Sequence, residues 1–206
     1  MKRTYILLLV ILCLSSIGYA QISDANTITL TASLNSSLSL TIDQSSVNMN
    51  FDTDEDYKSG VGLGKYFSKG NVAATTNWKL SCKAITKFLH EDGKTVMPLN
   101  NIGVRAEYNG TSKIRNYTDK MPKALSLNEI DLIGYDGVNS NANDKDENSF
   151  VLFWEMGTMN GNMNSQNLLK QNLKKGSYST KLAVVVTEVI RWLFLLSSAI
   201  NNDQRV

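Results

Sequence analysis

The chain has 206 residues, of which 42% are hydrophobic and 19% charged, and it contains thirteen glycines and two prolines. This length and apolar content suit one domain with a real core, and they exclude collagen-like, coiled-coil and fully disordered chains. Of the 21 basic residues, Lys2 and Arg3 lie in a segment that we expect to be removed, so the remaining 19 balance the 19 acidic residues. A neutral chain without a basic stripe is poorly suited to bind nucleic acid.

Residues 1–20 have the three parts of a secretory signal peptide. A basic start precedes an apolar run from Tyr5 to Leu14, and the small residues Gly18 and Ala20 mark a cleavage site. The run is shorter than the roughly 20 residues that span a bilayer, which argues against a membrane helix. We therefore predict cleavage after Ala20 and a protein that is secreted, periplasmic or held at the cell surface.

Period-two alternation of apolar and polar residues recurs after the signal peptide and is typical of strands with one buried face. The alternating segments are residues 28–34, 38–42, 47–51, 78–84, 102–108, 150–156 and 178–186. No strand–helix–strand rhythm separates them. They predict an all-β chain that folds as an antiparallel immunoglobulin-like β-sandwich with long polar loops.

Helical signals are few. Residues 126–129 match a capping box, and residues 165–175 are compatible with a short turn of helix before Gly176. The stretch 52–70 is interpreted as a long polar connection, and its glycine-rich part, residues 60–65, as a flexible loop. It is not a phosphate-binding loop, because Tyr66 stands where that motif needs Ser or Thr.

The two cysteines give no disulfide in the mature chain, because Cys13 lies in the signal peptide. Cys82 shares the apolar side of its segment with Trp78 and Leu80. We predict a small buried side chain at Cys82 rather than a nucleophile.

Catalytic motifs are absent from the sequence, and we predict that the protein is not an enzyme. His90 is the only histidine, and it precedes the turn signal Asp92-Gly93, which predicts an exposed strand end. A pair of carboxylates would suffice for glycoside hydrolysis, but no pair is singled out.

Two weak patterns point to ligands. Asp52, Asp54 and Asp56 place carboxylates at alternate positions, as at the start of a calcium loop, although Tyr57 replaces the glycine of that motif. The simpler interpretation is that these carboxylates are exposed to solvent in a loop and bind nothing. The sequence indicates no other cofactor. Aromatic side chains in polar connections, which suit sugar binding, are found at Tyr66, Phe67, Tyr117 and Tyr135.

The C-terminal end differs from the rest. Residues 189–200 are dense in large apolar side chains, and the chain turns polar from Asn201 onward. The apolar stretch is too short, and too interrupted by Arg191, to predict a membrane span. An extra buried strand, an interfacial helix and a partner-binding tail all remain open. We divide the chain into a signal peptide (1–20), a β-sandwich domain (21–190) and a tail (191–206).

Residues 28–34, 71–80 and 176–184 resemble segments of small secreted β-sandwich proteins of Gram-negative bacteria, the spore coat protein U-like and pilin-like domains. The end of the signal, Ala20-Gln21, resembles those of the Bacteroidetes. The resemblance implies an immunoglobulin-like sandwich that serves as a surface or fimbrial subunit. This chain departs from the family in lacking a disulfide and in continuing beyond the last strand.

These observations predict a non-enzymatic structural or adhesive protein of the fimbrial-subunit kind. Its partners would be a second copy or another subunit, bound through the terminal edge strands at 27–34 and 178–186. The alternative is a carbohydrate-binding module, with calcium as a possible aid. An open sheet edge favours the subunit, whereas rings and acids gathered in one groove favour the module.

Overall fold

The computed structural model describes residues 36–44 and 46–189, and they are almost entirely β-structure. Their strands are β1 (Leu38–Ile42), β2 (Val61–Ala74), β3 (Trp78–Ala84), β4 (Phe88–His90), β5 (Val96–Met97), β6 (Ile102–Tyr108), β7 (Arg115–Asn116), β8 (Lys123–Ala124), β9 (Ile130–Gly134), β10 (Ser149–Met156), β11 (Tyr178–Ser179) and β12 (Leu182–Glu188). The helical elements are α2 (Asp54–Ser59) and the short 3-10 turns η1 (Leu99–Asn101) and η2 (Leu168–Gln171). The predicted all-β class is confirmed.

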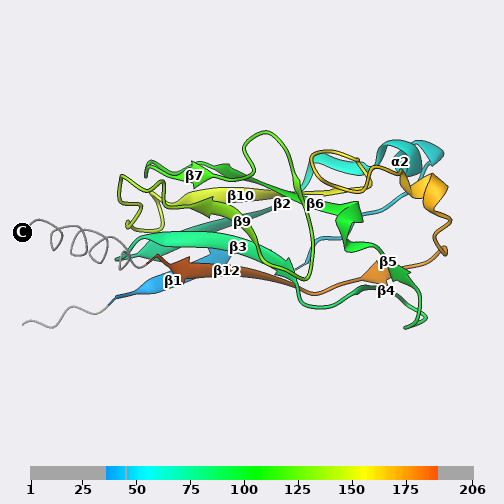
Figure 1. Cartoon of the computed structure of the whole chain (residues 1–206), viewed down its shortest axis with the longest axis horizontal. Coiled ribbons are helices and arrows are strands. Elements are labelled where there is room, and N and C mark those ends of the chain that lie inside the picture. Colours follow the sequence, from blue (N-terminus) through cyan, green and yellow to red (C-terminus); the bar gives the residue numbers. More distant parts are fainter. Residues whose placement is uncertain (1–35, 45, 190–206) are drawn as a thin grey trace, which may run out of the picture. The chain divides into compact units, whose positions relative to one another are not determined.

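Two antiparallel sheets form the layers of a sandwich (Figure 1). The five-stranded sheet has the order β1-β2-β10-β6-β8, and the four-stranded sheet has the order β12-β3-β9-β7. Strands β2 and β3 follow each other in the chain yet lie in different sheets, as do β9 and β10, so the chain crosses between layers as immunoglobulin-like sandwiches do. A third, small sheet, β11-β4-β5, lies at one end.

The core lies between the two larger sheets and is built by alternation. On β3, Trp78, Leu80 and Cys82 are completely buried, while Lys79 and Lys83 face outward. The same pattern buries the inner side chains of β6 and β10. The predicted strands at 38–42, 78–84, 102–108 and 150–156 are confirmed.

The predicted strand at 47–51 is wrong, because residues 46–53 form no strand. Val47, Met49 and Phe51 nevertheless pack against the core with alternate side chains. Alternation here reflects one-sided burial of an extended segment that no neighbouring strand pairs with.

The stretch 52–70 is not a polar loop. It holds α2 and the first part of β2, and the expected flexible glycine segment is the start of that strand. A Cβ on Gly60 would lie 2.3 Å from the backbone carbon of Gly157, and one on Gly62 would lie 2.6 Å from the Cα of Glu155. The glycines therefore permit a close backbone approach between β2 and the end of β10.

Two smaller predictions concern helices and the last strand. Residues 126–129 are not helical, because the Ser126 hydroxyl accepts the Asn128 N–H in a local turn. Residues 165–175 do contain a short turn, η2. The predicted strand at 178–186 is split into β11, which pairs with β4, and β12, which pairs with β3.

Several predicted segments lie outside the described residues: the signal peptide, the strand at 28–34 and the C-terminal tail. Within the described ranges, no helix has the length and apolar character needed to cross a membrane.

Candidate functional site

The edge strands β1 and β12 lie next to each other along one side of the sandwich (Figure 1). They belong to different sheets, and among the described strands β1 pairs only with β2 and β12 only with β3. We call the line between them the β1–β12 seam.

Apolar side chains along the seam are only half-buried. They are Leu38 and Leu40 on β1 and Leu182, Val184 and Val186 on β12. Their neighbours one strand further in, such as Val72 on β2 and Leu80 on β3, are completely buried. Among the described residues the core is therefore incompletely covered along this side.

The outer backbone edges of β1 and β12 pair with no other strand of the described ranges. Natural proteins protect such edges with proline, bulges or charges. Neither strand contains proline, β1 carries no charge, and the only charge on β12 is Glu188 at its end. The seam thus offers both apolar surface and backbone donors and acceptors to an added strand.

The three aspartates of the calcium hypothesis do not gather around a common point. Asp56 lies in the first turn of α2, where its carboxylate accepts the backbone N–H groups of Asp52 and Thr53. These hydrogen bonds, with the one to Thr53 foremost, lower the pKa of Asp56. No group of three or more His, Cys, Asp or Glu side chains suited to a metal occurs in the described part of the chain. Calcium binding stays a prediction, and the capping box of α2 accounts for the position of Asp56.

His90 is at the end of β4, as predicted, but it is not exposed: only 4% of it is accessible. Its Nδ1 accepts the Asp92 N–H at 3.0 Å, so Nε2 carries the proton and donates to the Lys175 carbonyl at 2.9 Å. Gly176 makes room for the ring, since a Cβ there would lie 2.3 Å from Nε2. The imidazole therefore holds the β4–β5 hairpin to the segment before β11.

Cys82 is completely buried, as predicted, and burial raises the pKa of its thiol to about 12. Because thiolate is the reactive form, we expect no labelling of the native protein by a charged thiol reagent at neutral pH. Full labelling should follow denaturation in guanidinium. Rapid labelling without denaturant would show that β3 opens or is wrongly placed.

The aromatic candidates fall into three places. Tyr66 packs against the core, whereas Phe67, the next residue on β2, points to the outer face of the five-stranded sheet. Tyr117 and Tyr135 line a shared depression on the four-stranded sheet. The cations Arg115 and Lys123 lie 5.1 and 5.4 Å from the centre of the Tyr117 ring.

One functional candidate was missed from the sequence. Phe153 pairs with Phe67 across β10 and β2 and lies on the same outer face. It sits between the buried side chains of β10, and its position next to Phe67 depends on strand register.

No protein-family model matches the chain, and no curated protein matches it at a significant level. The likeness to spore coat protein U-like and pilin-like domains therefore remains a resemblance of sequence segments.

Proposed function

We propose that the protein is a non-enzymatic structural subunit, exported from the cell, that assembles by adding a strand at the β1–β12 seam. The observation that carries this proposal is the half-buried apolar row along the seam, beside two strand edges that no described strand pairs with. A strand placed there would cover the row and satisfy the backbone groups of the edge it joins.

The added strand that suits the seam best is residues 27–34 of a second copy. Ile28, Leu30, Ala32 and Leu34 alternate with polar residues, so one face of that strand would meet the apolar row while the other stayed in water. The apolar tail after Val189 is the competing occupant.

The test measures molar mass by light scattering over a range of concentrations, using the mature chain from Gln21 to Val206. We expect oligomers whose mass rises with concentration. Leu30→Asp should yield monomer, because it places a charge against the apolar row. Thr29→Asp is the matched control: it adds the same charge on the opposite face of the strand, and oligomers should persist.

A mature chain that is monomeric at every concentration would overturn the proposal, as would equal effects of the two substitutions. Truncation after Glu188 examines the tail. Retained or stronger association agrees with residues 27–34 as the added strand, whereas a fall to monomer identifies the tail as the contact and contradicts that assignment.

A further inference from the structure

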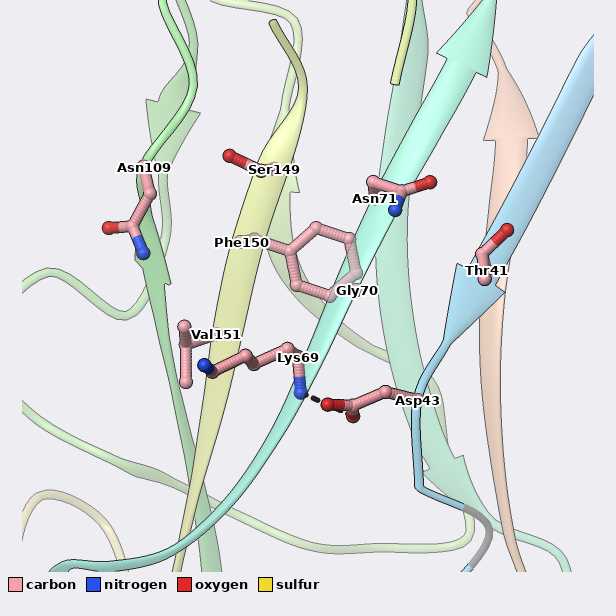
Figure 2. A pocket seen from close by; sticks show the side chains of 9 residues that line it. All are labelled: Thr41, Asp43, Lys69, Gly70, Asn71, Asn109, Ser149, Phe150 and Val151. Carbon is pink, nitrogen blue, oxygen red and sulfur yellow. Dashed lines mark hydrogen bonds between the residues drawn. The ribbon is translucent and has the colours of Figure 1, made fainter. Parts of the chain in front are cut away.

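The outer face of the five-stranded sheet carries a shallow open depression of about 360 Å³. Figure 2 shows its side chains in two rows across the strands. One row holds Asn109, Ser149, Asn71 and Thr41, and the next holds Val151, Lys69 and Asp43. Hydroxyl, amide and charged groups from β1, β2, β10 and the turn after β6 thus converge on one surface.

An aromatic pair adjoins the depression. Phe67 on β2 stands opposite Phe153 on β10, with the ring centres 6.3 Å apart, and Phe67 is 36% exposed. Lys69 joins the two parts, since it lines the depression and its ammonium lies 5.8 Å from the centre of the Phe67 ring. The Arg105 guanidinium lies 4.6 Å from the centre of the Phe153 ring.

The charges of this surface indicate the chemistry of its occupant. The ammonium group of Lys69 forms no ion pair with the described residues, and Arg105 has only a loose one, 3.7 Å from Glu107. Two cations, Lys69 and Arg105, therefore lie beside the rings. The Asp43 carboxylate is engaged by the backbone N–H of Lys69 at 2.7 Å. The aromatic part thus offers positive charge to a ligand.

We propose that this outer face binds an acidic polysaccharide. A pyranose ring packs against Phe67 and Phe153, and its carboxylate pairs with Lys69 or Arg105. Hydroxyls of sugars further along the polysaccharide meet Asn71 and Ser149, which lie four residues from the aromatic pair along β2 and β10. A sugar ring has an apolar face and a polar rim, and the surface presents matching aromatic and polar parts side by side. The inference is independent of the β1–β12 seam, because it uses side chains on the outer face of the sheet.

The experiment is affinity electrophoresis of the full mature chain in gels that contain polygalacturonate, with its methyl ester and dextran as uncharged comparisons. We expect retardation by polygalacturonate alone, weakened by salt. Phe67→Ala should weaken binding about tenfold, and Phe67→Tyr, which keeps the ring, should bind nearly as well as the parent.

Lys69→Gln should weaken binding to polygalacturonate, while Lys83→Gln, the same charge change on the outer face of the other sheet, should leave it unchanged. Thermal unfolding of each variant reports whether it is folded. Absence of retardation, equal loss in the two lysine variants, or equal binding of the methyl ester would each overturn the proposal. Intact binding in folded Phe67→Ala would do so too, and would place the polysaccharide on another surface.

Discussion

Replacing Trp78 by alanine should lower the free energy of unfolding by about 3–5 kcal/mol, the cost of removing a fully buried ring. Trp78 is completely buried at the start of β3. Its indole N–H donates to the Asn141 carbonyl at 2.7 Å, and Asn141 in turn bonds both the N–H and the carbonyl of Trp78. The substitution thus leaves a cavity and removes the closer of the two donors to the Asn141 carbonyl, the other being the Asn148 side-chain amide at 3.2 Å. Urea denaturation followed by circular dichroism measures the change.

Two further variants separate the cost of the cavity from the cost of the lost hydrogen bond. Trp78→Phe fills most of the cavity but removes the indole donor, so it should cost about 1–3 kcal/mol. Val138→Ala, at a side chain that is 77% exposed, should change stability by less than about 0.5 kcal/mol. A loss below about 1 kcal/mol for Trp78→Ala would contradict the position of this residue in the core.

Gly60→Ala is expected to be strongly destabilising, with a loss of roughly 3 kcal/mol or more in the free energy of unfolding. Gly60 has φ 77°, and its Cβ would lie 2.3 Å from the backbone of both Gly157 and Thr158. Backbone atoms cannot turn aside as a flexible side chain does, so β2 would have to move away from the end of β10.

Gly64→Ala is the matched control. Gly64 also has a positive φ, 89°, but no atom lies within 4 Å of its Cβ position. It should cost only about 1–2 kcal/mol, the price of the backbone conformation alone. Similar losses for the two variants in urea denaturation would show that β2 and β10 do not approach as closely here as the structure has them.

Prediction from the sequence succeeded where one strand buries one face. The alternation of Trp78, Leu80 and Cys82 identified both the strand and its buried side, because side-chain direction depends only on position along the strand. The prediction failed at Gly60 to Gly64, where β2 begins. The positive φ angles of the glycines and the exposed Leu63 break the alternating pattern, and the regular pairing of β2 with β10 begins only at Tyr66.

The candidate surfaces were harder to predict, because they depend on which strands become neighbours. Nothing near Phe67 in the sequence indicates that it meets Phe153, and nothing near His90 indicates that Gly176 makes room for its ring. The alternation of apolar and polar residues near the two ends of the chain, at 27–34 and 178–186, did predict edge strands. That β1 and β12 lie next to each other in opposite layers follows from the whole topology of the sandwich and not from any local pattern.

The register of β1 and β12 has a practical consequence for engineering. Leu38 stands opposite Ala74, and Glu188 stands opposite Trp78, so the chain enters and leaves the described region at the same end of the sandwich. The opposite tip, with α2 and the β4–β5 hairpin, is remote from both connections (Figure 1). A peptide tag or a second domain inserted at the turn around Gly93, where no atom lies within 4 Å of its Cβ position, would project from that tip and leave both connections undisturbed.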